Sequence, residues 1–150
     1  MDTKKIGSLR LAQFFVCCFM LALVVICLGA PKFVPWFAAL RGAPLTGREP
    51  LLLASIYLSV PPAAWVLWLL HRLLGRIRRG QVFTRENAAS LGRISVCCMI
   101  AAVIFALSAL YYPSFWMLAV TAALVSLMLG VLHTVFAQAV DIKEENDLTV

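Results

Sequence analysis

The stretch that decides the fold runs from residue 94 to residue 140 and reads ISVCCMIAAVIFALSALYYPSFWMLAVTAALVSLMLGVLHTVFAQAV. It holds 47 residues without one Asp, Glu, Lys or Arg. A helix crosses the roughly 30 Å hydrocarbon of a bilayer with about 20 apolar residues, so this run is long enough for two crossings. Pro113 interrupts it, flanked by Tyr111, Tyr112 and Ser114. Because proline breaks a helix and tyrosine favours the membrane–water interface, we expect a tight hairpin between two spans.

Two further runs without charge precede this stretch, Leu11–Pro31 and Pro50–Leu70, each of 21 residues. With 63% apolar residues and a mean hydropathy of +0.93, the chain is too apolar for a soluble domain. The first apolar run exceeds the roughly 7–15 residues of a signal-peptide core, so we expect an uncleaved helix. The sequence therefore predicts an all-α membrane protein, a single-domain antiparallel four-helix transmembrane bundle with spans at about 8–29, 50–74, 90–112 and 114–140.

Basic residues divide unequally between the two sides of such a bundle. One side holds ten, in the N-terminal tail, in the loop 71–93 and in the tail 141–150: Lys4, Lys5, Arg10, Arg72, Arg76, Arg78, Arg79, Arg85, Arg93 and Lys143. The other side holds three: Lys32, Arg41 and Arg48. Since basic residues favour the cytoplasmic side, we expect both termini and the loop in the cytoplasm. The predicted location is the bacterial cytoplasmic membrane, crossed several times.

Prolines and capping residues set the expected helix boundaries. Three prolines within about 30–49 argue against a long regular element there, and residues 35–41 form either one or two surface turns or an irregular connector. Pro61-Pro62 predicts a kink in the second helix. Thr84 is suited to cap the third helix, Glu86 falls in its first turn, and Asn87 stands where a capping box places its return partner.

Two segments resemble the motifs of a family of small bacterial membrane proteins of unknown function. The loop follows the pattern G-x-x-F-T-x-E-N-x-x-x-L from Gly80 to Leu91, and residues 144–150 follow E-x-N-D-L-T-[IV]. The resemblance implies four spans over essentially the whole chain. Genes of this family often lie beside a small helix-turn-helix transcription regulator, so the resemblance also suggests such a regulator as a partner.

The basic loop and the acidic tail together form a candidate interaction surface. Its residues are Arg76, Arg78, Arg79, Phe83, Thr84, Glu86, Asn87, Glu144, Glu145, Asn146 and Asp147. Three interpretations remain open. The tail folds onto the loop through ion pairs; the arginines bind anionic lipid headgroups and leave the tail to a protein partner; or the arginines only set the topology.

His133 is the candidate intramembrane polar site, since it lies about 10 Å inside the last span. A neutral histidine bonded to another helix is the alternative to a functional role. Cys17-Cys18 and Cys97-Cys98 are interpreted as packing residues, because neighbouring positions on a helix do not face one ligand together.

The sequence contains no pattern typical of a catalytic, cofactor-binding or metal-ligating site, so we expect a protein without enzyme activity, cofactors or direct nucleic acid binding. The favoured function is a regulatory or interaction protein that presents the basic loop and acidic tail to a cytoplasmic partner. The alternatives are a subunit of a small oligomeric transporter or channel, and an immunity-type protein against membrane-active peptides. A homo-oligomer also remains open.

Overall fold

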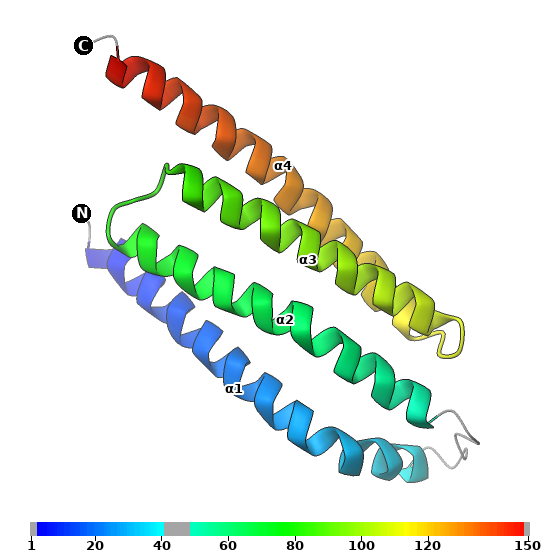
Figure 1. Cartoon of the computed structure of the whole chain (residues 1–150). Coiled ribbons are helices and arrows are strands. Elements are labelled where there is room, and N and C mark those ends of the chain that lie inside the picture. The colour runs from blue at the N-terminus through cyan, green and yellow to red at the C-terminus, as the bar shows by residue number, and fades with distance from the viewer. Residues whose placement is uncertain (1–2, 41–48, 149–150) are drawn as a thin grey trace.

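The structure is a computed structural model that describes residues 3–40 and 49–148, most of which form four long helices. These are α1 (Thr3–Leu40), α2 (Glu49–Arg78), α3 (Arg85–Ala109) and α4 (Phe115–Leu148), which run in alternating directions (Figure 1). All four are long and apolar enough to cross a membrane. The predicted all-α, antiparallel four-helix architecture is confirmed, and the chain is a multi-pass membrane protein.

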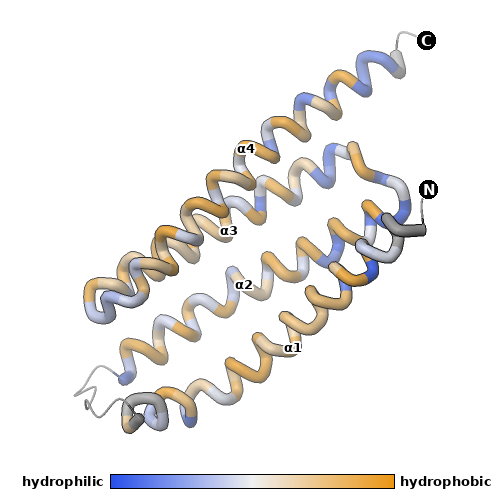
Figure 2. The backbone as a smooth tube through the Cα atoms, turned by 180° about the vertical axis from the view of Figure 1, so that it is seen from behind, coloured by the Kyte–Doolittle hydropathy of each residue, from blue (hydrophilic) through white to orange (hydrophobic). Residues whose placement is uncertain are grey.

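The beginning of α1, the α2–α3 loop and the end of α4 lie together at one end of the molecule. Hydrophilic residues gather there, whereas the middle of each helix is mainly hydrophobic (Figure 2). We call this the basic end. The opposite end holds the α3–α4 turn at Pro113, which confirms the predicted hairpin, since Trp116 N–H donates to the Pro113 carbonyl at 3.0 Å.

The helices pack in chain order as an open row. α1 contacts α2, α2 contacts α3 and α3 contacts α4, and no other pair of helices is in contact within the described residues. More of the buried residues that the structure describes belong to α3 than to any other helix, namely Asn87, Ala88, Ser90, Leu91, Ile94, Ala102 and Ser108. The core of the molecule is therefore centred on α3, with α1 at its periphery.

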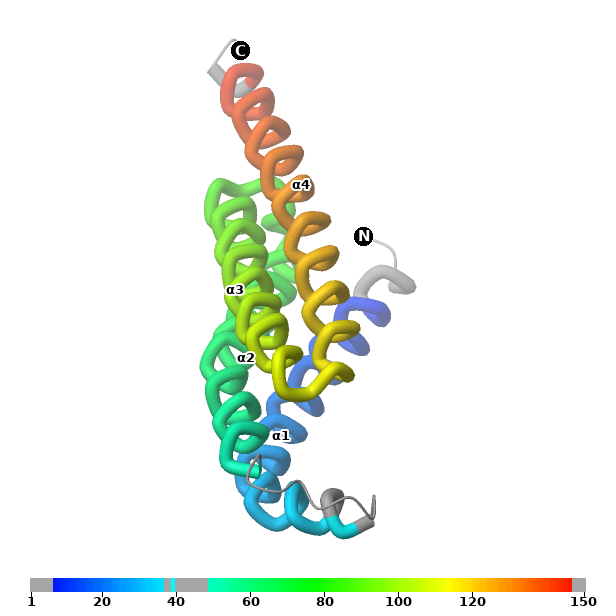
Figure 3. Tube along the Cα trace, turned by 90° about the vertical axis from the view of Figure 1, so that its right-hand side faces the viewer, coloured from blue at the N-terminus to red at the C-terminus, as the bar shows by residue number. Residues whose placement is uncertain are grey.

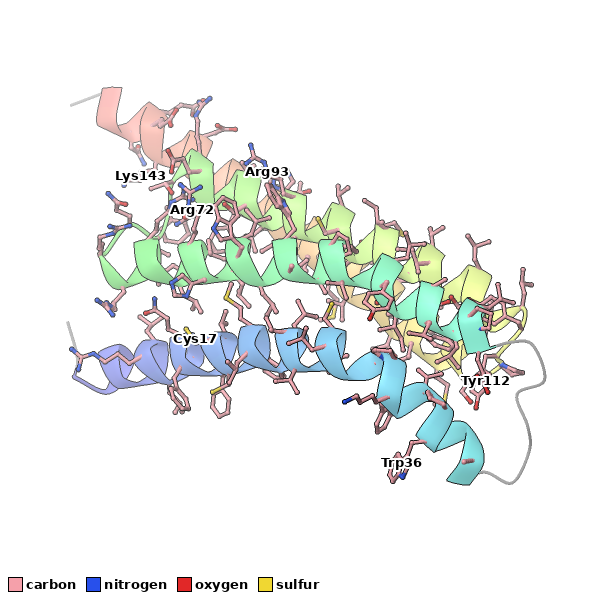
Figure 4. The ribbon with its side chains drawn as sticks, turned by 60° about the horizontal axis from the view of Figure 1, so that its bottom comes forward. Cys17, Trp36, Arg72, Arg93, Tyr112 and Lys143 are labelled. Carbon is pink, nitrogen blue, oxygen red and sulfur yellow. The ribbon has the colours of Figure 1, made fainter. Side chains whose placement is uncertain are left out.

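Helix α1 continues through Pro31 and Pro35 to Leu40, so the prediction that no long regular element follows residue 30 is wrong. Figure 4 shows the ribbon changing direction ahead of Trp36. Carbonyl groups freed by proline can be satisfied by water or headgroups near the end of a span, so the helix bends without ending. The rest of the expected connector, 41–48, lies outside the described residues.

Helix α4 also extends further than predicted. It runs eight residues past Val140 to Leu148, so most of the segment expected to be a separate polar tail is helical. No proline or glycine occurs between these positions, and lysine and glutamate are good helix formers. Helix α2 likewise ends at Arg78, four residues beyond the predicted span, and contains both Pro61 and Pro62.

The most extensive contact in the row joins α3 to α4. Ser95 Oγ donates to the Ser126 carbonyl, and Ser126 Oγ donates to the Ser95 carbonyl, both at 2.8 Å. One turn away on each helix, a Cβ added at Gly92 would lie 3.2 Å from His133 Nδ1, and one at Gly130 would lie 3.5 Å from Ser95 Oγ. Small residues thus let the two backbones approach closely, as is typical of helix pairs in membranes.

Polar contacts also join the other neighbours in the row. Near the hairpin end, Ser108 Oγ of α3 donates to Ser55 Oγ of α2 at 2.8 Å, and Tyr111 hydrogen-bonds to both serines. Helix α1 is held by Tyr57, whose hydroxyl donates to the Cys27 carbonyl at 3.0 Å. These bonds fix the position of each helix along the axis of its neighbour, because apolar contacts alone give little directional preference in lipid.

We expect Gly92→Val to destabilise the protein by about 1–3 kcal/mol, because the added branch would collide with the His133 ring. Thermal unfolding in detergent measures the effect. Gly75→Val is the matched control, since no atom lies within 4 Å of a Cβ at Gly75. Equal melting temperatures for the two variants would show that the α3–α4 approach is not as close as described.

Candidate functional site at the basic end

The α2–α3 loop is a short ordered turn held together by Asn87. The Asn87 side chain is completely buried, and its Nδ2 donates to the carbonyls of Gln81 at 2.6 Å and Val82 at 2.9 Å. Gly80 has a φ of 82°, a conformation that favours glycine. Glycine and asparagine of the loop motif thus shape the turn, and Asn87 is not available on the surface for a partner.

Thr84 caps α3 as predicted, but Asn87 does not complete a capping box. Thr84 Oγ1 accepts a hydrogen bond from the Asn87 N–H at 3.3 Å, with Thr84 in an extended backbone conformation. The Asn87 side chain instead donates to the preceding turn. The expected return bond from the Asn87 side chain to the cap residue does not form. The amide instead donates to two loop carbonyls that would otherwise be buried without a donor.

Arg76 is an internal brace between α2 and α3. Its NH2 lies 2.7 Å from Glu86 Oε2, and its NH1 donates to Ser90 Oγ at 3.3 Å. Only 13% of the Arg76 side chain is exposed, against 73% for Glu86. A guanidinium buried to this extent has its charge compensated within the protein, so Arg76 holds the loop and leaves the exposed arginines to face outward.

The acidic end of α4 is attached to the first residue of α3. Arg85 donates to Glu144 through Nε at 2.9 Å and through NH2 at 2.6 Å, and its NH2 lies 3.7 Å from Asp141 Oδ1. The hydrogen bond and the charge of Glu144 raise the pKa of Arg85, and the hydrogen bond from Arg85 lowers the pKa of Glu144. Of the predicted ion pairs between tail and loop, this one forms within the described side chains.

An aromatic contact supports the same arrangement. The rings of Phe83 in the loop and Phe136 on α4 are stacked with centroids 5.6 Å apart, and 48% of Phe83 remains exposed. Phe83 therefore both anchors the loop to α4 and offers an apolar surface beside the arginines. Figure 3 shows the end of α4 projecting beyond this loop.

The predicted surface thus separates into two groups. Arg76, Thr84 and Asn87 hold the loop in shape. The exposed residues are Arg78, Arg79, Phe83, Glu86, Glu144, Glu145 and Asn146. Arg78 NH1 also donates to Gln13 Oε1 of α1 at 3.4 Å. The side chain of Asp147 lies outside the described part of the structure.

Two contributors, Arg85 and Ser90, are absent from the predicted surface. Arg85 occupies a variable position of the loop motif, and Ser90 lies on the buried side of α3. A signal for Arg85 was available in the sequence. It directly follows the cap residue Thr84, and the loop is predicted to lie on the same side of the membrane as the acidic tail. No comparable sequence signal marks Ser90.

His133 lies away from this surface, on the face of α4 that contacts α3. Its Nδ1 is 2.7 Å from the Ala88 carbonyl oxygen. Because a carbonyl only accepts hydrogen bonds, Nδ1 carries the proton. The interpretation of His133 as a histidine bonded to another helix is confirmed in its geometry. The ring also lines an open pocket between α2, α3 and α4.

Replacing Asn87 with alanine should lower the free energy of unfolding by about 1–3 kcal/mol, because two loop carbonyls lose their donor. Thermal unfolding in detergent measures the loss. The control is Gln81→Ala, which keeps the backbone carbonyl that Asn87 uses and should leave stability unchanged. A similar loss in both variants would contradict the assigned role of Asn87.

The Arg85–Glu144 pair predicts a pH dependence with a defined sign. Because the pKa of Glu144 is lowered from its ordinary 4.5, the pair stabilises the attached helix end above that value and is lost as the pH falls through the lowered pKa. In Arg85→Gln the pKa of Glu144 should rise toward 4.5, as followed by carboxyl-carbon NMR titration. Arg79→Gln is the control of equal charge and should leave the titration of Glu144 unchanged. An identical titration of Glu144 in the wild type and in Arg85→Gln would exclude the pair.

The chain was compared with known proteins at the level of families, curated proteins and solved structures. The curated proteins and the solved structures gave no match. One family model matches residues 8–150, described as a protein of unknown function (DUF2975). This range includes all four spans, the loop motif and the end of α4. The chain therefore belongs to the DUF2975 family of proteins of unknown function.

Proposed function

We propose that this is a non-enzymatic regulatory or interaction protein that presents its basic end to a partner in the bacterial cytoplasm. The excess of basic residues at this end supports the orientation, with both termini and the loop cytoplasmic. The observation that carries the proposal is the attachment of the helical end of α4 to Arg85, beside an ordered loop.

The composite surface has the features of a docking site. Asp141, Glu144 and Glu145 lie on the exposed end of α4, Arg78 ends α2 and Arg79 follows it, so the same end of the molecule exposes both negative and positive groups. Ile142, which is 60% exposed, and Phe83 add apolar surface. Surfaces that combine complementary charge with exposed aromatic or aliphatic groups are suited to protein partners.

Preorganisation supports the same proposal. A tail that remained flexible would lose conformational freedom on binding, whereas a helical end fixed by a bidentate ion pair loses less. The partner that the family resemblance suggests is a small helix-turn-helix transcription regulator encoded beside the gene. Its capture at the membrane would couple an event in the bundle to transcription.

The test is co-purification in detergent with the adjacent regulator, where the genome encodes one. The full chain should retain the regulator, and deletion of residues 144–150 should reduce retention at least tenfold. Glu49→Gln, on α2 at the opposite end, is the control and should behave as wild type. Equal retention by the deletion variant would contradict the role of the α4 end.

The transporter or channel interpretation predicts the opposite pattern. His133→Leu would then impair transport while the deletion of 144–150 would leave it intact, and no regulator would be retained by the full chain. This combination of results would replace the proposed function.

A further inference from the structure

Two arginines near the basic end, Arg72 on α2 and Arg93 on α3, have no carboxylate partner among the described residues. Both are exposed. Arg93 lies eight residues, or about 12 Å, inside the start of α3. Since a crossing takes about 20 residues and α3 ends at Ala109, Arg93 lies close to the boundary of the hydrocarbon. At that depth a guanidinium needs a negatively charged group, from protein or from lipid.

The packing of α2 on α3 brings the two arginines to the same depth. Arg76 contacts Ser90 near the basic end, and Ser55 contacts Ser108 near the other end. Close to the first of these contacts, Arg72 lies about one turn before Arg76 on α2 and Arg93 lies about one turn after Ser90 on the antiparallel α3, so the two arginines lie at a similar depth. Figure 4 labels both in the same part of the molecule.

Tryptophans connect the arginines along one face. The Arg72 guanidinium carbon lies 4.9 Å from the centre of the Trp68 ring, a cation–π contact. Trp68 contacts Trp65, with ring centroids 5.1 Å apart. Trp65 in turn lines a pocket of about 580 Å³ whose wall includes Arg93. Arg72 and Arg93 therefore belong to one continuous surface.

The pocket opens between three helices and extends from Arg93, at the boundary of the hydrocarbon, toward the membrane interior. It is lined by Trp65 of α2, by Gly92, Arg93 and Ser95 of α3, and by Gly130 and His133 of α4. Gly92 and Gly130 contribute backbone to its wall, because neither carries a side chain. His133 donates through Nδ1 to the Ala88 carbonyl, so Nε2 is the ring nitrogen that would contact a headgroup.

We propose that this pocket binds the headgroup of an anionic phospholipid, with Arg93 and Arg72 contacting the phosphate. A guanidinium matches two phosphate oxygens at once, and tryptophan rings favour the interface where the acyl chains begin. Basic pockets between transmembrane helices are suited to such headgroups. The site is separate from the exposed loop arginines and does not depend on the proposed protein partner.

The test uses tryptophan fluorescence in vesicles. The chain contains four tryptophans, so Trp36→Phe and Trp116→Phe leave only Trp65 and Trp68 as reporters. This protein is reconstituted in phosphatidylcholine that contains increasing fractions of brominated phosphatidylglycerol or brominated phosphatidylcholine, which quench on contact. Brominated phosphatidylglycerol should quench at a lower mole fraction than brominated phosphatidylcholine.

Replacing Arg72 or Arg93 with glutamine should in each case reduce the preference for phosphatidylglycerol about fivefold. This factor corresponds to the attraction of about 1 kcal/mol between one basic residue and anionic lipid. The double variant Arg78→Gln, Arg79→Gln removes two charges from the loop and is the matched control, which should keep the full preference. Helix content by circular dichroism verifies that each variant is folded.

Three outcomes would overturn the proposal. Equal quenching of the unaltered site by both brominated lipids would show that it does not select charge, and this comparison needs no arginine variant. An equal loss in the loop control would assign the preference to the overall charge. Relief of quenching by excess inorganic phosphate would assign the pocket to free phosphate.

Discussion

The close approach of α3 and α4 at Gly92 and Gly130 is the contact on which the rest of the arrangement depends. Apolar side chains gain little by leaving lipid for one another, so helices in a membrane associate through tight packing and interhelical hydrogen bonds. The reciprocal Ser95–Ser126 bonds supply both at this contact. They set the position of α4 along α3, and this position brings Glu144 to Arg85 and Phe136 to Phe83. The attachment of Glu144 at the basic end is thus a consequence of small residues about four to five turns away along α4.

The open row explains why α1 differs from the other helices. It contacts α2 alone within the described residues, and most of its large apolar side chains are exposed. In water such a helix would be unstable, but in a bilayer its backbone bonds are internal and lipid covers its side chains. Helix α1 is therefore held at the periphery by its packing on α2 and by the hydrogen bonds from Tyr57 to the Cys27 carbonyl and from Arg78 to Gln13.

Features that depend on local chemistry could be predicted from the sequence, whereas those that depend on packing could not. The spans follow from runs without charge, the hairpin from Pro113, and the start of α3 from Thr84. The continuation of α1 past Pro31 could not be predicted, because the cost of a proline depends on whether the freed carbonyls reach water or headgroups. The direction of the Asn87 side chain was also inaccessible, since it is decided by the two loop carbonyls that need a donor in the folded turn.

The structure changes the interpretation of the loop motif from a binding surface to a set of residues that shape the turn. Its glycine, threonine and asparagine are used within the turn, and its glutamate is paired with the largely buried Arg76. Among the residues that define the motif, Phe83 and Glu86 combine an internal contact with a large exposed area. The motif therefore specifies the shape of the loop, while the residues that it leaves variable, such as Arg85, decide what the loop attaches to. A partner at this end would therefore contact mainly the variable residues that the motif holds in position, and the motif residues to a smaller extent.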